Sequence, residues 1–157
     1  MEVLKAAGEH KGCAFVEIYQ NCVIFNDNAF LDVSDKQIRD ERSIKLVEGQ
    51  PLIFGKERNR GIRMRGTEME VVTFDPASPP DDLLVHHATK DDTVYAHLLA
   101  RMEEVPELPI PLGVFRAIEK PTYDQMLDSQ VEAAIQKKGK GDINQLLNTG
   151  DTWTVGK

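Results

Sequence analysis

The strongest hydrophobic pattern in the sequence is the run Ala14–Tyr19, which a single charged residue, Glu17, interrupts. A nearly continuous run of apolar and β-branched residues is typical of a strand in a sheet that is covered on both faces. The polar segment Gln20–Cys22 ends the run, and the apolar patch Val23–Phe25 then leads into the turn-prone Asn26–Asn28. The pattern predicts a buried strand followed by a loop that carries a cysteine.

Helical patterns occupy both ends of the chain and part of its middle. Met1–Ala7 has helical composition without a capping residue ahead of it, as if the chain opened on the last turns of a helix. Capping boxes at Ser34–Gln37 and Thr122–Gln125 predict a short helix to about Arg42 and a longer one that ends at Gly139. Two further helices are predicted, over Thr93–Glu104 with Asp91 or Asp92 as its cap, and over Asp142–Leu147.

Short β-like runs separated by glycine-containing turns follow the short helix that is predicted to end near Arg42. They predict a small antiparallel meander built from Ile44–Val47, Pro51–Phe54, Gly61–Met64 and Met69–Phe74. The basic segment Lys56–Arg65 is predicted to be an exposed hairpin within it. Two later runs, Leu83–Val85 and Gly113–Ile118, also have strand character.

Composition narrows the class of protein. With 157 residues, 41% of them hydrophobic and 29% charged, the chain has the size and composition of one soluble globular domain. A net charge of −7 argues against non-specific nucleic-acid binding. No apolar run is long enough to cross a bilayer, and Met1–Gly12 lacks the apolar core of a signal peptide, so we expect a cytoplasmic protein with no membrane partner.

The two cysteines, Cys13 and Cys22, flank the predicted strand at opposite ends. Nine extended residues span up to roughly 30 Å, so neither a disulfide between them nor a shared metal ion is expected. Cys22 follows the carboxyl end of the strand, where α/β sheets hold their ligands. From the residues alone, a small buried hydrophobe is the slightly favoured interpretation of Cys22, and a reactive site is the alternative.

Other candidate sites in the sequence are weak. His86 and His87 would face opposite ways on a strand, so we expect solvated or capping histidines and no metal site there. The motifs GxSxG, GxGxxG and GxxxxGK[ST] are absent from the sequence. The residues by themselves indicate an α/β domain and do not specify its chemistry.

A family resemblance adds the chemistry. HKGCAFVEIYQNCVIFNDNAF (His10–Phe30) closely resembles a segment of the β subunit of 2-oxoacid:ferredoxin oxidoreductases, especially the 2-oxoglutarate type. The resemblance continues in order through nearly the whole chain, in RDE (Arg39–Glu41), LVEGQPLIFG (Leu46–Gly55), LLVHHA (Leu83–Ala88), PLGVFRAIEKPTYD (Pro111–Asp124) and GDTWTV (Gly150–Val155). It implies oxidative decarboxylation of a 2-oxoacid on thiamine diphosphate, formation of an acyl-CoA, and electron transfer through a [4Fe–4S] cluster to ferredoxin.

The resemblance is to the carboxyl-terminal half of that subunit. The family's amino-terminal half carries the motif for Mg²⁺ and thiamine diphosphate and three cluster cysteines, none of which this sequence contains. The family's remaining cluster ligand corresponds to Cys22. Gln20, Asn21 and Asn26 would line the cofactor pocket or donate hydrogen bonds to the cluster, and ordinary loop solvation is the equal alternative for these three. The implied partners are the missing amino-terminal half, the α subunit and ferredoxin, with CoA and a 2-oxoacid as substrates. We expect no activity from the chain alone.

The resemblance also implies a division of the chain. Residues 1–33 would be the end of a parallel-sheet domain of the thiamine-diphosphate-binding type, and residues 34–157 a carboxyl-terminal extension with the meander, helices and tail. Two other functions stay open from the residues: a non-catalytic module that binds a partner or dimerises, and a small-molecule-binding α/β domain in which Cys22 is buried.

Overall fold

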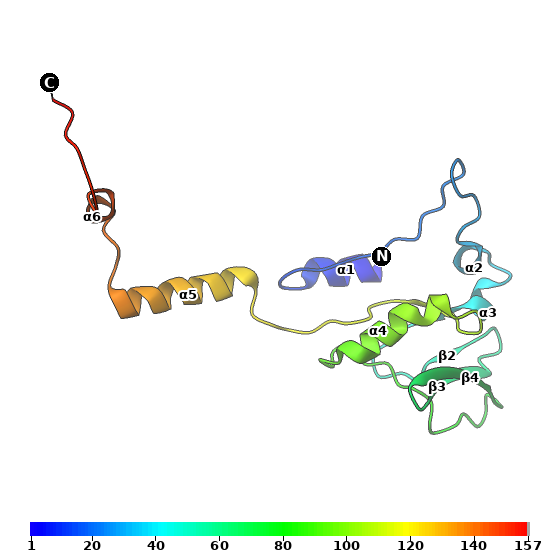
Figure 1. The fold of residues 1–157 in the computed structure, drawn as a ribbon. Coiled ribbons are helices and arrows are strands. Elements are labelled where there is room, and N and C mark those ends of the chain that lie inside the picture. The colour runs from blue at the N-terminus through cyan, green and yellow to red at the C-terminus, as the bar shows by residue number, and fades with distance from the viewer. Residues whose placement is uncertain (157) are drawn as a thin grey trace. The chain divides into compact units, whose positions relative to one another are not determined.

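The computed structural model describes residues 1–156, which form two compact units (Figure 1). The first unit contains Met1–His10 and Ala14–Glu119. The second contains Lys11–Cys13 and the carboxyl-terminal segment from Lys120 onward. The architecture is mixed α/β, with a two-stranded parallel sheet, a three-stranded antiparallel sheet and carboxyl-terminal helices, as the sequence predicts at this level.

The first helix is confirmed and the strand expected after it is wrong. Helix α1 covers Glu2–Glu9, and its N-cap Met1 makes no side-chain capping hydrogen bond. Ala14–Tyr19 forms no strand, and Phe15 and Ile18 are 90% and 67% exposed. A strand needs a neighbour for its backbone hydrogen bonds, and none of the described strands pairs with this segment. Only Val16 and Tyr19 of this run are partly covered by the described residues, and its other side chains are exposed.

The antiparallel meander is confirmed for three of its four expected strands. Strands β2 (Ile53–Phe54), β3 (Arg60–Arg65) and β4 (Glu68–Thr73) pair in that order, with Ile62 opposite Val71. The prediction that Lys56–Arg65 is an exposed hairpin is wrong at Gly61 and Ile62, which are buried, whereas Met64 and Arg65 are exposed.

The expected first strand of the meander belongs to a different sheet. Strand β1 (Ser43–Lys45) pairs in parallel with β5 (Ile110–Leu112), and Ile44 faces Pro111. The strand expected over Gly113–Ile118 is wrong, because pairing ends at Leu112 and Gly113 turns the backbone to a φ of +148°.

Two short helices replace the single helix expected between Ser34 and Arg42. Helices α2 and α3 cover Leu31–Ser34 and Arg39–Arg42. Ser34 ends the first helix and caps nothing, because the Asp35 carboxylate accepts the hydrogen bond from the Gln37 backbone N–H at 2.8 Å. The predicted helix end at Arg42 is confirmed.

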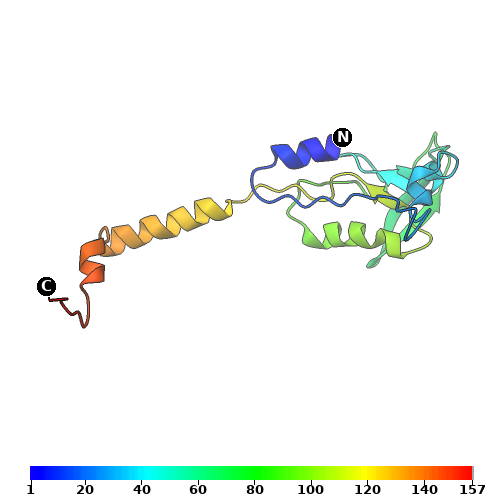
Figure 2. The same cartoon turned by 90° about the horizontal axis from the view of Figure 1, so that it is seen from above.

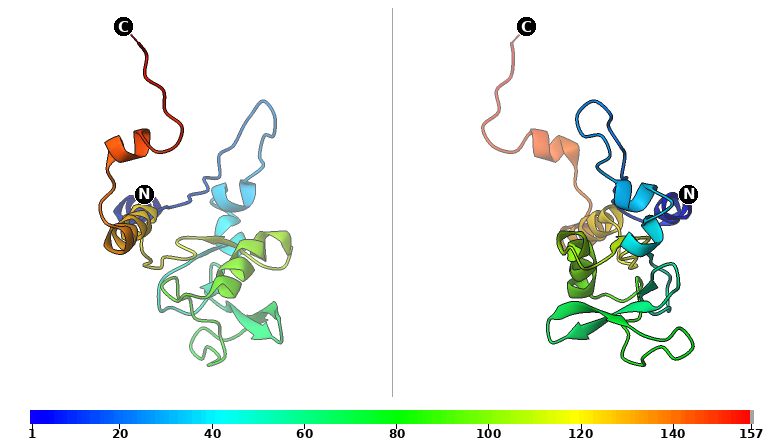
Figure 3. Two further views of the ribbon diagram at one scale, coloured as in Figure 1. Left: turned by 60° about the vertical axis from the view of Figure 1, so that its left-hand side comes forward. Right: turned by 90° about the vertical axis from the view of Figure 1, so that its right-hand side faces the viewer.

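Helix α4 (Thr93–Arg101) and the 3₁₀ turn η1 (Met102–Glu104) lie where a helix was predicted. Asp92 is the cap, and its carboxylate accepts from the backbone N–H groups of Val94 and Tyr95. Leu99 and Met102 are fully buried and share the core with residues of both sheets. Figure 3 shows α4 beside the antiparallel sheet. The buried core contains Ile44, Leu46, Leu52, Phe54, Ile62, Leu99, Met102 and Leu108.

The second unit contains helices α5 (Tyr123–Lys138) and α6 (Ile143–Leu147) (Figure 2). The predicted capping box is present, since Thr122 and Gln125 exchange hydrogen bonds, and Gly139 ends α5 with a φ of +79°. Neither helix has a buried residue. Among the described residues, no helix is both long and apolar enough to cross a membrane.

Candidate functional site

The Cys22 loop, residues 20–29, is the candidate site that the sequence predicts, and it is a tight turn. The backbone N–H of Asn26 donates to the carbonyl oxygen of Cys22 at 2.9 Å, and the two residues form an isolated antiparallel bridge. The turn therefore places Asn21, Cys22 and Asn26 on one short loop, as their spacing predicts. Cys22 itself is exposed, so the prediction of a buried cysteine is wrong.

Asp27 stabilises the far side of this turn. Its Oδ1 accepts a hydrogen bond from Nδ2 of Asn21 at 2.9 Å and another from the backbone N–H of Asn28 at 2.9 Å. Asn28 has a φ of +63°, a conformation that asparagine adopts more readily than most residues. The turn that Asn26–Asn28 predicts is therefore present, with Asp27 as its acceptor.

Backbone N–H groups of the turn donate hydrogen bonds to the Cys22 sulfur. Hydrogen bonds from Phe25 and Ile24, and a smaller contribution from Asn26, lower the pKa of the thiol below its ordinary value. Loss of some hydration around the sulfur opposes this effect. Since the thiolate is the form that attacks electrophiles and binds metals, the loop favours the chemically active form of Cys22.

Tyr19 and Phe30 close the base of the loop. Their rings stack with centroids 4.9 Å apart, and the Tyr19 hydroxyl donates a hydrogen bond to Glu103. Burial, together with that hydrogen bond, raises the pKa of Tyr19, so the phenol stays protonated as the donor. At the tip of the loop, the side chains of Val23, Ile24 and Phe25 are 73%, 81% and 89% exposed.

The loop offers one metal ligand and not a complete metal site. Both cysteines are free, which agrees with the predicted absence of a disulfide. The described residues contain no group of three or more His, Cys, Asp or Glu side chains that could hold a metal ion. The exposed thiol and its N–H donors fit one position of an iron–sulfur cluster, because thiolates ligate such clusters and hydrogen bonds to sulfur tune their potential.

The prediction that both histidines are solvated or capping is wrong for His86, which is only 2% exposed. Its ring nitrogens contact Tyr95 and Val114, from segments that follow it in the chain. His87 is partly exposed and lies 3.3 Å from Glu48. Sequence spacing could not reveal this burial, because the surrounding segments are distant in sequence.

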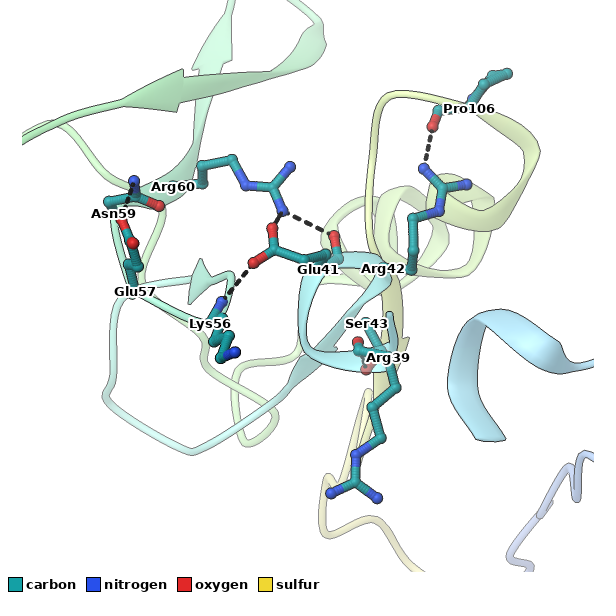
Figure 4. A network of polar contacts seen from close by, with 9 residues as sticks. All are labelled: Arg39, Glu41, Arg42, Ser43, Lys56, Glu57, Asn59, Arg60 and Pro106. Carbon is teal, nitrogen blue, oxygen red and sulfur yellow. Dashed lines mark hydrogen bonds and ion pairs between the residues drawn. The ribbon is translucent and has the colours of Figure 1, made fainter. Parts of the chain in front are cut away.

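A second polar cluster connects α3 to the β2–β3 turn (Figure 4). The Glu41 carboxylate accepts from the Lys56 backbone N–H at 2.8 Å and pairs with the Arg60 guanidinium. Arg60 also donates to the Glu41 carbonyl oxygen at 2.9 Å and lies over the Phe54 ring, 4.5 Å from its centroid. These contacts hold the turn in place, and we assign them a structural role.

Comparison with known proteins gives one informative match. No family model matches the chain, and no solved structure matches it. The 2-oxoglutarate oxidoreductase subunit KorB of Mycobacterium tuberculosis is 42% identical over an alignment of 157 positions. The alignment covers 98% of this chain and 41% of KorB. The chain is a homologue of KorB. It spans less than half of the length of KorB, and the aligned region includes both of its units and the Cys22 loop.

Proposed function

We propose that this chain is the carboxyl-terminal part of the β subunit of a 2-oxoacid:ferredoxin oxidoreductase of the 2-oxoglutarate type. The observation that supports this proposal most directly is the 42% identity to KorB over 98% of the chain. An alignment of that extent includes the sheets, the helices and the Cys22 loop together. It is therefore not the likeness of a single motif.

Cys22 is the residue to which we assign a direct role, as one thiolate ligand of an iron–sulfur cluster. Its sulfur is exposed, and the backbone N–H groups of Phe25, Ile24 and Asn26 favour its deprotonated form. A [4Fe–4S] cluster normally needs four such ligands, so the others would come from the remainder of the subunit. In the complete enzyme, thiamine diphosphate with Mg²⁺ would supply decarboxylation of the 2-oxoacid, and the cluster would carry electrons to ferredoxin.

Asn21 and Asn26 support Cys22 in this proposal. The Asn21 amide is engaged by Asp27, so Asn21 acts by holding the loop in shape. Asn26 acts through its backbone N–H, which donates to the Cys22 carbonyl oxygen and contributes to the lowered pKa of the thiol. Both are positioning residues, because neither side chain needs to touch the cluster for these effects.

The first measurement is the mass of the native polypeptide, purified anoxically from its source together with its co-purifying chains. A complex of this chain with the complementary amino-terminal part is then reconstituted with iron and sulfide. We expect Cys22→Ser to abolish the visible absorbance of the cluster and Cys13→Ser, at the other exposed cysteine, to preserve it. Equal cluster content in the two variants would contradict the assignment of Cys22.

A second function, a non-catalytic module that binds a partner protein, is favoured by one observation. The apolar residues of α5 are between 44% and 78% exposed, which is unusual for a helix that has no partner. The two functions differ in the Cys22→Ser experiment. A partner-binding module would assemble with the same companion chains whether or not Cys22 is present, and its complex would contain no cluster.

A further inference from the structure

Helix α5 carries an apolar stripe along its whole length, and the described structure leaves that stripe uncovered. Tyr123, Leu127, Val131 and Ile135 recur at four-residue intervals, and they are 78%, 45%, 50% and 44% exposed. Residues at these intervals lie on one face of a helix. A stripe of this kind normally packs against another apolar surface, because continuous exposed apolar patches are rare on monomers.

The helix is also charged asymmetrically from end to end. Asp124, Asp128 and Glu132 follow one another at four-residue intervals, so they form an acidic row beside the stripe in the first two-thirds of α5. The basic residues Lys137 and Lys138 occupy its last turn. One end of the helix is therefore negative and the other positive.

We propose that α5 of one copy pairs antiparallel with α5 of a second copy of this chain, stripe against stripe. An antiparallel arrangement sets the acidic start of each helix beside the basic end of the other. A parallel arrangement would set Asp124 beside Asp124 and Lys138 beside Lys138, and like charges in such positions repel. The charge pattern of α5 is self-complementary in the antiparallel arrangement, so a second copy of this helix fits it.

Two-fold symmetry fixes the contacts of this pair. In an isologous interface, residue i of one copy meets residue j of the other, and j meets i. When Val131, next to the midpoint of the 16-residue helix, is placed on the axis, Val131 meets Val131, Leu127 meets Ile135, and Asp124 lies beside Lys138. At 3.6 residues per turn, Asp124 and Lys138 lie about 20° to either side of Val131, so both face the partner helix, one at each end of the stripe.

Part of the charge pattern would be expected without any dimer. Acidic residues near a helix start and basic residues near its end stabilise the helix dipole within a single chain. The dipole does not explain the apolar stripe between these charges, nor its exposure. The test must therefore separate pairing between copies from stability within one helix.

Cross-linking of the full-length chain provides that separation. In a background of Cys13→Ser and Cys22→Ser, single cysteines are introduced by Val131→Cys, Leu127→Cys, Ile135→Cys or Ser129→Cys. We expect Val131→Cys to form a disulfide-linked dimer on mild oxidation, since Val131 would meet its own copy. Leu127→Cys and Ile135→Cys should link mainly when the two variants are mixed. Ser129→Cys, on the opposite face of α5, is the matched control and should stay monomeric.

The charges are tested by sedimentation equilibrium on the chain with its native cysteines. Loss of the two symmetric exposed ion pairs in Lys138→Asp should raise the dimer dissociation constant about tenfold. Adding Asp124→Lys restores opposite charges in the antiparallel pair, so the double variant should recover most of the affinity. If these charges acted only on the helix dipole, the double variant would bind more weakly than Lys138→Asp alone, because both ends of its helix would carry unfavourable charges.

Three results would overturn the proposal. The first is a monomer at about 100 μM, a concentration at which a weak specific interface is still populated. The second is self-linking of Leu127→Cys as efficient as that of Val131→Cys, which indicates parallel helices. The third is cross-linking of Val131→Cys no greater than that of Ser129→Cys, which indicates that α5 packs on its own chain or on another protein.

Discussion

The hydroxyl oxygen of Tyr95 lies 2.9 Å from Nδ1 of His86, and the imidazole is almost completely buried. The other ring nitrogen, Nε2, lies 3.0 Å from the carbonyl oxygen of Val114. Because a carbonyl only accepts, Nε2 carries the proton. Burial lowers the pKa of His86 and favours the neutral ring, in which Nδ1 accepts from the tyrosine hydroxyl. His86 therefore joins three segments of the first unit, and it does so as a neutral ring.

The first prediction concerns the pH dependence of stability. Burial lowers the pKa of His86 below its ordinary value, so the unfolded chain binds a proton more readily than the folded chain does. The free energy of unfolding should be highest above the unfolded pKa of about 6.5 and should fall as the pH drops below it. Urea titrations between pH 7.5 and about pH 5 measure this dependence.

The comparison that isolates His86 uses two variants. His86→Gln, which removes the titrating ring, should flatten the loss of stability below about pH 6.5. His87→Gln is the matched control, because His87 is adjacent in sequence and partly exposed beside Glu48. The same pH dependence in both variants would show that other groups cause it.

The second prediction concerns the close approach of β3 to Leu83. A Cβ atom at Gly61 would lie 2.7 Å from Cδ2 of Leu83 and 3.0 Å from Cε1 of Phe74. Gly61→Ala should therefore destabilise the fold by about 1–3 kcal/mol in urea denaturation, since a packed core resists added atoms. The control Gly8→Ala adds its Cβ to open space in α1 and should cause no loss. Equal effects of the two substitutions would argue against tight packing at Gly61.

Elements whose signals are local could be predicted from the sequence. The Thr122–Gln125 capping box, the Asp92 cap and the hairpin of β3 and β4 all depend on residues close together in the chain. Such signals need no knowledge of the rest of the fold. The Cys22 loop belongs to this class, because its site residues and the turn that places them together occur within six residues.

Elements that depend on distant partners could not be predicted in the same way. The run after Arg42 has the pattern of a meander strand, yet its partner is Ile110–Leu112, far along the chain. The pattern of Ala14–Tyr19 indicates burial, but the described residues supply no strand beside it. The contacts of His86 with Tyr95 and Val114 likewise follow from tertiary packing and leave no periodic signal.

The third prediction concerns the Glu41 cluster in Figure 4. Glu41→Ala leaves the Lys56 backbone N–H without its acceptor and Arg60 without its ion pair. Both groups are partly exposed, so water compensates in part, and we expect a loss of about 1 kcal/mol in thermal or urea unfolding. Glu57→Ala is the control, because Glu57 makes only a long 3.4 Å contact with Asn59 on the surface. If both variants lost equal stability, the cluster would not be what holds the turn.

The fourth prediction concerns the reactivity of Cys22, and it tests the loop without requiring a cofactor. In a Cys13→Ser chain, Cys22 is the only thiol, and iodoacetamide labels it at a rate proportional to its thiolate fraction. Hydrogen bonds from Phe25 and Ile24 lower the pKa of this thiol, so labelling should reach half its maximal rate at a lower pH in the folded chain than in urea.

The same measurement identifies what holds the donors in place. Asn21→Ala removes the 2.9 Å hydrogen bond to Asp27 without changing the charge of the loop. Because the turn then has more freedom, its N–H groups should lie near the sulfur for less of the time, and the midpoint pH should move toward the unfolded value. A midpoint unchanged by Asn21→Ala would mean that the turn from Cys22 to Asn26 is rigid without Asp27. A folded chain with the midpoint of the unfolded one would contradict the hydrogen bonds to sulfur, and with them the physical argument for Cys22 as a thiolate ligand.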